Sequence, residues 1–585
     1  MNNWQTSSFN SSDGINLFYR FHNKDTDNKT VLLFLHRGHE HSGRIVEIAD
    51  QISAQYYSCY AFDLRGHGRS AGPRGWAQGF DNWVDDLNSF TRHLRDIHGV
   101  DSNNIILVAN SVGSVMAVSW ILRYGANIKA CILGAPAFSI RLYIPFALTG
   151  LRLMRQFSDH LFVTSYVKSG LLTRDENQAN AYDEDELITK KIGVNVLVSL
   201  FDCVKNCFSR LKDFETPVLV LTAEKDFIVN NRWHQRFIDG ISSTHKRHIT
   251  LPDFRHAIFH EADREQVITH CREFIEQNKT TPTRNLPAVI PTAREHTRAE
   301  YQQLINPVSL PKRIFWQSYR WLLEKVGSKS TGVATGLQHG FDSGVSLDYI
   351  YQNSPAGENW LGKIFDRIYL GSVGWRGIRK RKRNLKKTLT FVSSRLEQHG
   401  ASLRILDIAS GPGRYLFEFQ QASAVEVQLT LNDTDPASIA KAKIIAQEFG
   451  SDEIRFLSLD VFEQPLFESL AYRPNLIIVS GLLELYENNT QVHRLFARLY
   501  QQLDEGGYLV YTGQPWHPQI ELIGRLLNNR NKQRWVMRRR VQTELDELVE
   551  SAGFKKLHTA ADEDGIFTVS CAIKDESIEI TGEHK

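Results

Sequence analysis

The sequence predicts an α/β protein with two domains, and three observations lead to this prediction. The chain has 585 residues, more than one hydrophobic core usually organises. Short apolar runs alternate with longer amphipathic stretches in two separate series, the first between Val31 and Cys271 and the second from Asn384 onward. This alternation is typical of βαβ units around parallel sheets. Between the two series the pattern is lost, so we expect the chain to divide there.

The expected boundaries follow from this break in the pattern. We expect a first domain over residues 1–277, a linker over 278–340 and a second domain over 341–585 with its core at about 400–575. Proline interrupts both helices and strands, and five of the 17 prolines fall between residues 278 and 312. Their clustering indicates a linker.

Six apolar runs predict the strands of each sheet. After the fourth run of the first series a mostly helical pattern, at about 137–212, predicts an inserted cap. The runs of the first series are Val31–Leu35, Tyr57–Phe62, Ile105–Ala109, Ala130–Leu133, Val218–Thr222 and Arg247–Leu251. Those of the second are Leu403–Ile408, Val427–Leu431, Ile454–Leu459, Leu476–Val479, Tyr508–Thr512 and Phe567–Ile573.

Composition is that of a globular protein, with 42% hydrophobic and 23% charged residues. The net charge of +3 gives no reason to expect a nucleic-acid partner. The six cysteines lack the spacing of a zinc site or a disulfide framework, so we expect no metal and a reducing cytoplasm. The sequence begins without the pattern of a secretory signal, and no apolar run reaches the ~20 residues of a membrane-spanning helix.

The first candidate site starts from a serine. A β-branched run ends in Ala109-Asn110-Ser111-Val112-Gly113, where small residues flank Ser111 as in a strand–turn–helix nucleophile elbow. A serine needs a base that a carboxylate orients. Asp226 follows the run at 218–222, and His256 follows the next run, in the order serine, acid, histidine. We expect Ser111 to be the nucleophile, His256 the base and Asp226 its orienting acid. His260 is an alternative base, which we disfavour because His260-Glu261 is typical of a helix start.

With these motifs the N-terminal half resembles the monoacylglycerol lipase and lysophospholipase group of α/β-hydrolases, which is related to serine aminopeptidases. His36–Arg44 resembles the oxyanion loop of that group and Asp63–Ser70 its Gly-His-Gly turn. The resemblance implies an oxyanion hole from the backbone of Gly38 and Val112, a cap that admits an acyl chain, and a small or lipid-like ester substrate. Arg37 departs from the usual glycine of the loop. A peptidase or amidase of the same fold stays open as an alternative.

The second candidate site starts from a glycine-rich turn. A predicted buried strand ends in Asp407-Ile408-Ala409-Ser410-Gly411-Pro412-Gly413, where the glycines let the backbone approach a ligand and Pro412 suits a first helical turn. Asp433 follows the next strand, where an acid can hold ribose hydroxyls. Asp460 and Val461 follow the third strand and suit an adenine.

These motifs resemble class I S-adenosylmethionine-dependent methyltransferases, which have a Rossmann-like fold. The resemblance implies that Asp407, Ala409, Gly411 and Gly413 hold the methionine moiety of S-adenosylmethionine, with Asp433 on its ribose and Asp460 and Val461 on its adenine. A dinucleotide-binding domain is the alternative, but its fingerprint is incomplete because Leu416 stands at the last glycine position. Glu484, Tyr486 and His517 follow the fourth and fifth strands and are candidate acceptor contacts. A C-terminal half that binds a nucleotide or a partner without catalysis also stays open.

Two basic clusters remain, at Arg376–Lys387 and Arg538–Arg540. A solvated helix face is the favoured interpretation of each. Peripheral contact with anionic lipid at the inner membrane surface is the second hypothesis, since the first domain is expected to cleave a lipid ester.

Overall fold

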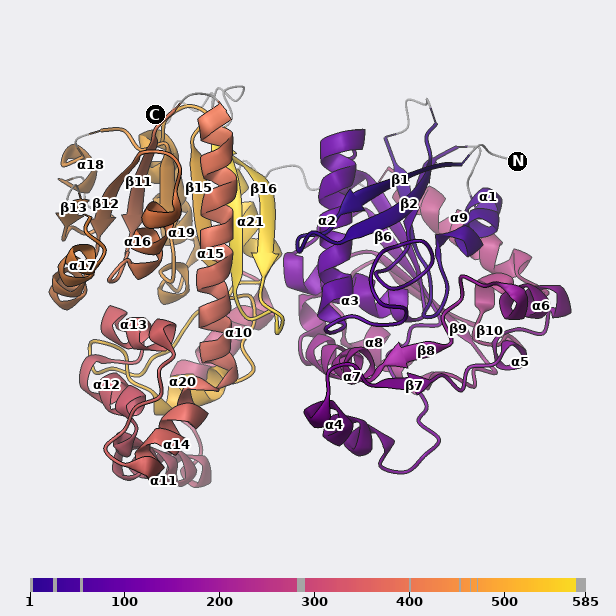
Figure 1. The fold of residues 1–585 in the computed structure, drawn as a ribbon, viewed down its shortest axis with the longest axis horizontal. Coiled ribbons are helices and arrows are strands. Elements are labelled where there is room, and N and C mark those ends of the chain that lie inside the picture. The colour runs from indigo at the N-terminus through magenta and orange to yellow at the C-terminus, as the bar shows by residue number, and fades with distance from the viewer. Residues whose placement is uncertain are drawn as a thin grey trace. The chain divides into compact units, whose positions relative to one another are not determined.

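The structure is a computed structural model that describes residues 4–24, 29–52, 56–280, 290–398, 401–451, 454–462, 465–470 and 472–574. The chain divides into two compact units, Met1–Asn285 and Leu286–Lys585, and each has its own sheet (Figure 1). The prediction of two α/β folds, the first with a helical cap and the second Rossmann-like, is confirmed.

The first unit is built on an eight-stranded sheet in the order β1-β2-β4-β3-β5-β6-β9-β10. From β4 to β10 neighbouring strands are parallel, whereas β1 and β2 pair antiparallel at one edge. The strands are β1 (Gln5–Asn10), β2 (Asn16–His22), β3 (Val31–Leu35), β4 (Ser58–Phe62), β5 (Ile105–Asn110), β6 (Ala130–Gly134), β9 (Val218–Ala223) and β10 (Lys246–Leu251).

Burial explains which strands the sequence could predict. Every residue of β3, β5, β6 and β9 is buried, because helices cover both faces of a parallel sheet, and these strands therefore appear as continuous apolar runs. The edge strand β1 is exposed at five of its six positions and has no such run, so the sequence analysis missed it. The helices around this sheet are α1 (Val46–Ile52), α2 (Asp81–His98), α3 (Val112–Tyr124), α8 (Arg232–Gly240) and α9 (Glu265–Asn278).

The cap lies in the chain between β6 and β9. Four helices and a two-stranded antiparallel sheet form the cap, so the alternation of parallel strands and helices is interrupted there. Its elements are α4 (Ala147–Phe157), β7 (Phe162–Thr164), α5 (Ser169–Leu172), α6 (Glu176–Glu184), β8 (Lys191–Gly193) and α7 (Val194–Ser209).

The second unit has a seven-stranded sheet in the order β13-β12-β11-β14-β15-β17-β16. The first five strands are parallel in the Rossmann order, but β17 is antiparallel to both of its neighbours, unlike the sixth parallel strand of a dinucleotide-binding domain. The strands are β11 (Leu403–Ile408), β12 (Val427–Asn432), β13 (Ile454–Leu457), β14 (Leu476–Val479), β15 (Tyr508–Gly513), β16 (Phe554–Ala561) and β17 (Thr568–Lys574). The helices associated with it are α15 (Val373–Gln398), α16 (Arg414–Ala422), α17 (Pro436–Glu448), α18 (Pro465–Glu468), α19 (Asn489–Gln502) and α21 (Gln542–Ser551).

The predicted linker over 278–340 is wrong for most of its length. Residues 281–289 lie outside the described residues, but from Glu295 onward the chain is helical and belongs to the second unit. Pro311 occupies the first turn of α11, a position that favours proline, so this proline marks a helix start and not a linker. The helices of this region are α10 (Glu295–Ile305), α11 (Leu310–Lys325), α12 (Thr331–His339), α13 (Gly344–Gln352) and α14 (Trp360–Leu370), with α20 (Ile520–Leu526) from later in the chain.

Candidate active sites

Ser111 lies at the sharp turn between β5 and α3. Its backbone has φ 53° and ψ −112°, a conformation that residues other than glycine rarely adopt and that costs on the order of 1–3 kcal/mol. The Ser111 N–H donates to the carbonyl oxygen of Gly134 on the neighbouring strand at 2.8 Å, which holds the turn in place. Strain of this kind, held by surrounding contacts, is typical of a nucleophile elbow.

The structure brings together the three side chains that the sequence analysis predicted to form the catalytic triad. The His256 ring lies between the other two, with Nε2 2.8 Å from Ser111 Oγ and Nδ1 2.8 Å from Asp226 Oδ2. All three side chains are buried. His260, the alternative base, instead directs Nε2 toward the Arg44 carbonyl oxygen at 3.3 Å.

Asp226 is held as a carboxylate. Burial alone would raise its pKa, but His256 and the backbone N–H groups of Val229 and Ile228 outweigh burial, so the pKa is lowered. Those two N–H groups donate to Asp226 Oδ1 at 2.9 and 2.7 Å. Its other oxygen is therefore left to orient the His256 ring.

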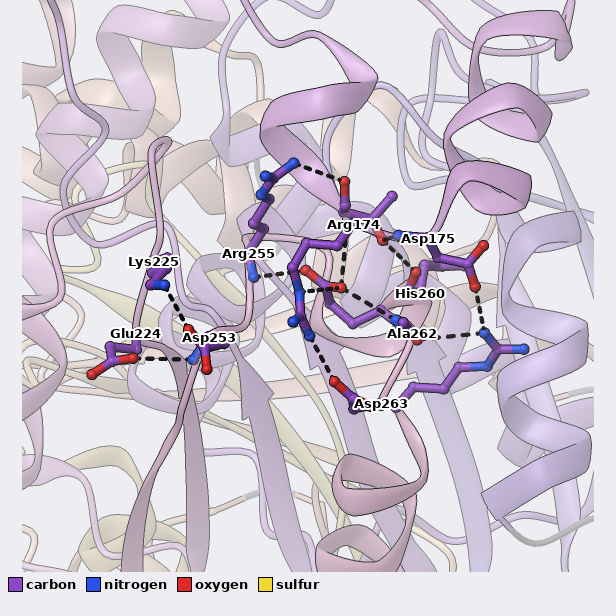
Figure 2. A network of polar contacts seen from close by, with 12 residues as sticks. Arg174, Asp175, Glu224, Lys225, Asp253, Arg255, His260, Ala262 and Asp263 are labelled. Carbon is purple, nitrogen blue, oxygen red and sulfur yellow. Dashed lines mark hydrogen bonds and ion pairs between the residues drawn. The ribbon is translucent and has the colours of Figure 1, made fainter.

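The loop that carries His256 is fixed by a network of charged side chains (Figure 2). Buried Glu261 accepts hydrogen bonds from the Arg255 backbone N–H at 2.8 Å and from Arg174 Nε, a residue of the cap region, at 3.2 Å. The Lys225–Asp253 ion pair, at 2.5 Å, joins the loops of Asp226 and His256. The sequence analysis missed this network because its members are distant in sequence and form no motif.

The proposed oxyanion donors lie beside each other. A Cβ placed on Gly38 would stand 3.3 Å from Val112 Cγ2, so Gly38 lies against the Val112 side chain. Arg37, the departure from the resembled family, brings no free cation to the site. It is buried, its Nη2 pairs with Glu40 Oε1 at 2.8 Å, and its guanidinium lies over the ring of Tyr182 from the cap.

In the second unit the glycine turn follows β11. Ala409, Gly411 and Gly413 all have positive φ, of 59°, 55° and 67°. A Cβ on Gly413 would stand 2.3 Å from Leu431, so packing requires that glycine. A Cβ on Gly411 would be in ordinary contact with Gly344 Cα at 3.6 Å, so packing alone does not require this glycine.

A small cavity of about 70 Å³ lies at this turn. Ala409, Gly411, Gly413 and Asp433 line it, together with Arg381 of α15. Asp433 already accepts from the Gly411 N–H at 2.8 Å, and Arg530 Nη1 lies 3.5 Å from its other oxygen.

Three of the predicted cofactor contacts do not line this cavity. Asp407 lies buried with one oxygen accepting from Tyr415 at 2.6 Å, and its Oδ1 has no hydrogen-bond partner among the described residues. Burial raises the Asp407 pKa to about 8. Asp460 is exposed, and its Oδ1 accepts from the Phe462 N–H at 2.9 Å, while Val461 packs in the core.

A larger chamber of about 510 Å³ adjoins the small cavity. Asp342, Leu347, Arg381, Gly481 and Arg530 line both spaces. Because α11 and α12, which lie within the predicted linker, supply part of the wall, the sequence analysis did not predict this chamber.

Two of the three predicted acceptor contacts, Glu484 and His517, line the chamber, whereas Tyr486 does not. Burial raises the Glu484 pKa, against the opposing charge of Arg381. Burial lowers the His517 pKa to about 4, and its Nδ1 accepts from the Gln519 N–H at 3.0 Å. His517 is therefore a neutral ring at pH 7, with its hydrogen on Nε2. Tyr486 instead packs edge-on against Phe462 at 5.0 Å, and burial raises its pKa to about 12.

The favoured interpretation of the two basic clusters is correct only in part. On α15, Lys380 pairs with Glu563 at 2.7 Å, while Lys382 and Lys386 pair with Glu418 at 2.5 and 3.0 Å. Arg538, Arg539 and Arg540 are buried and hydrogen-bonded, so this second cluster is no solvated face.

The described residues were also compared with the requirements of a membrane-spanning helix, a metal site and a disulfide. No helix there has the length and apolar character to cross a bilayer, and no group of three or more histidine, cysteine or acidic side chains could hold a metal ion. All six cysteines are among the described residues, and they are buried and form no disulfide.

Comparison with known proteins gives two family matches. Residues 26–263 match the family described as "Serine aminopeptidase, S33", and residues 271–574 match the family described as "Putative methyltransferase". The Escherichia coli protein named "Uncharacterized protein YnbC" is 36% identical over 97% of this chain and 98% of its own length. Phospholipase YtpA of Bacillus subtilis and the monoacylglycerol lipase of Mycolicibacterium smegmatis are each 23% identical, over 42% and 46% of this chain and 95% of their own lengths.

Proposed function

The chain belongs to the methyltransferase family matched over residues 271–574 and carries a serine aminopeptidase S33 domain before it, and from this premise we propose a bifunctional enzyme. The first unit hydrolyses acyl esters, and the second transfers a methyl group from S-adenosylmethionine. The observation that carries the proposal is the unbroken chain of contacts from Ser111 through His256 to Asp226.

The geometry supports hydrolysis through an acyl-enzyme. Ser111 Oγ attacks the ester carbonyl carbon while His256 Nε2 takes its proton, and the same proton then passes to the departing alcohol. A water molecule, deprotonated by His256, releases the acid and restores Ser111. In this proposal the backbone N–H groups of Gly38 and Val112 hold the oxyanion, and Asp226 stabilises the imidazolium.

Lipid-like esters are the proposed substrates. Two relatives of the first unit are named a phospholipase and a monoacylglycerol lipase. The cap adds an independent observation, because Phe146, beside α4, and Phe157, at its end, are each 87% exposed. Exposed apolar side chains of this size suit contact with a lipid surface. This contact is our proposal for peripheral membrane association, and cysteines that form no disulfides support a proposed cytoplasmic location.

The proposal that the second unit binds S-adenosylmethionine depends on Arg381 and the glycine turn. Arg381 is buried, and its Nε has no hydrogen-bond partner among the described residues, although it lines the cavity beside Gly411. A guanidinium in this position would hold the carboxylate of a methionine moiety, and the backbone at Gly411 would pass beneath it. S-adenosylmethionine, when bound, supplies the electrophilic methyl group.

Activity on a series of substrates tests the proposed function. We expect hydrolysis of p-nitrophenyl esters with acyl chains of 4 to 16 carbons, and no comparable hydrolysis of aminoacyl anilides. Faster cleavage of the anilides would favour the peptidase alternative. Calorimetric titration with S-adenosylmethionine tests the second unit, and NADH in the same experiment tests the dinucleotide alternative.

A further inference from the structure

The chamber of the second unit has an apolar wall and one polar end. Leu322 and Leu323 of α11, Ile368 of α14 and Leu526 of α20 contribute to the wall. Its volume of about 510 Å³ is within the range of small-molecule sites. Because such a wall offers few hydrogen bonds, a ligand that fills it must itself be largely hydrocarbon.

The polar end lies where the proposed methyl donor would react. Glu484 follows β14, which pairs with β11. Gln514 and His517 follow β15, which pairs with β14, so all three residues come from the carboxyl ends of neighbouring strands. Gln514 Nε2 is buried and, like Arg381 Nε, has no hydrogen-bond partner among the described residues. Buried polar atoms left without partners in a native fold call for an explanation, and a bound polar group supplies one.

Helices α11 and α14 (Figure 1), which both contribute residues to the chamber wall, also carry exposed apolar side chains. Trp321 is 60% exposed and Ile368 67% exposed, and the lining residue Leu322 is 45% exposed. Basic residues are interleaved with them along both helices: Lys312, Arg313, Arg320, Lys325, Lys363 and Arg367. This combination of aromatic, aliphatic and basic residues is typical of helices that lie at an anionic lipid surface.

We propose that this chamber is the methyl-acceptor site and that the acceptor is an amphiphile with one long hydrocarbon chain. The chain occupies the wall between α11, α14 and α20, and the polar group that receives the methyl lies at Glu484, Gln514 and His517. His517 donates a hydrogen bond from Nε2, and Glu484 accepts the proton that a hydroxyl or amine acceptor gives up. The inference rests on the proposed methyl transfer, and it makes both units act on one chemical class, chain-bearing lipids.

Photoaffinity labelling tests the proposal. The probe is a 1-O-hexadecylglycerol ether with a diazirine at the end of its chain, which the first unit cannot hydrolyse because it contains no ester. After irradiation of the full chain, cross-linked peptides are mapped by mass spectrometry. We expect labels on α11, α14 or α20, and competition by unlabelled hexadecylglycerol at least about tenfold stronger than by the octyl ether, since chain burial contributes about 0.8 kcal/mol per CH₂.

Matched substitutions on α14 locate the site. Ile364 and Ile368 lie one turn apart and are 41% and 67% exposed, but only Ile368 lines the chamber. We expect Ile368→Asp to reduce labelling of the chamber at least about fivefold, and Ile364→Asp to leave it unchanged. Both positions are exposed, so neither substitution should unfold the unit. Val333→Trp, which fills the chamber from α12, should have the same effect as Ile368→Asp.

Titration with S-adenosylmethionine separates failure of this inference from failure of the proposed function. If the cofactor binds but labels fall only on residues 1–285, the acceptor proposal is overturned while the methyltransferase proposal stands. If the chamber is labelled but the cofactor does not bind at millimolar concentration, both proposals are overturned and the chamber is a lipid site without methyl transfer. Equal labelling of the Ile364→Asp and Ile368→Asp variants also contradicts the assignment.

Discussion

The two candidate sites differ in whether the side chains that we assign to catalysis or binding already have partners within the protein. Around Ser111, both nitrogens of His256 and both oxygens of Asp226 have partners within the protein. In the second unit, Arg381 Nε and Gln514 Nε2, which belong to residues lining the chamber, have no hydrogen-bond partner among the described residues. The first site is therefore assembled in advance for a substrate that supplies only an ester, whereas the second lacks the partners that a bound ligand would provide.

The largest expected effect concerns the paired site. We expect Ser111→Ala to lower kcat/KM for acyl esters at least about 10⁴-fold, because the nucleophile is lost while the oxyanion donors remain. S-adenosylmethionine binding should not change. Ser114→Ala is the matched control, since Ser114 hydrogen-bonds only to backbone carbonyls of the elbow. A smaller loss of hydrolysis from Ser111→Ala than from Ser114→Ala would contradict the comparison.

The buried carboxyl of Asp407 predicts a pH dependence for the stability of the second unit. Its pKa of about 8 in the folded protein lies above the ordinary value of about 4, so the unfolded chain releases this proton at lower pH. The free energy of unfolding of the second unit should therefore fall as pH rises from about 4 to about 8, by on the order of a few kcal/mol. Asp407→Asn keeps the hydrogen bond from Tyr415 and should flatten this slope.

Denaturant unfolding of both chains at pH 5, 6, 7 and 8 measures the effect. Equal slopes for wild type and Asp407→Asn would show that the buried carboxyl does not govern this dependence.

Substitutions of Arg381 test whether its guanidinium binds S-adenosylmethionine. A charge-assisted hydrogen bond contributes about 1.5–3 kcal/mol, so Arg381→Met should weaken S-adenosylmethionine binding on the order of 10- to 100-fold. Arg381→Lys keeps the charge and should recover part of the loss. Calorimetry with S-adenosylmethionine and with the decarboxylated cofactor checks the assignment, because the variant should discriminate less between the two. Unchanged discrimination would place Arg381 away from the carboxylate.

Glu261 gives the smallest expected effect, because it acts through the position of His256. Glu261→Gln weakens the contacts to Arg174 and to the Arg255 backbone, and we expect about a tenfold loss of kcat/KM with a shifted pH profile. Asp253→Asn, which removes an exposed ion pair in the same network, should change kcat/KM less than about twofold. Equal losses in the two variants would indicate a general loss of stability.

The sequence predicted the parts of each site that come from single strand ends. Ser111 and Asp226 each follow a fully buried strand, whereas His256 follows the edge strand β10, in which only Leu251 is buried. The parallel arrangement of these strands brings their ends to one edge of the sheet. The same reasoning selected Gly411 and Glu484 in the second unit. These residues were accessible to sequence analysis because strand burial and turn geometry both leave local patterns.

What the sequence did not predict depends on contacts between distant segments. Residues 295–340 fall within the predicted linker because prolines at helix starts and between helices resemble linker prolines, yet α11 and α12 of this region supply part of the chamber wall. Asp460 follows its strand as predicted but is exposed beside a cavity it does not line. Whether a residue lines a cavity depends on the direction of its side chain and on packing between distant segments, and neither produces a local sequence motif.

Active-site labelling with a fluorophosphonate tests the central claim most directly. Peptide mapping of the labelled chain should place the adduct on Ser111, and His256→Ala should slow labelling by at least about 10²-fold because general-base activation is lost. An adduct on another serine, or labelling of Ser111 at the same rate without the imidazole, would contradict the account.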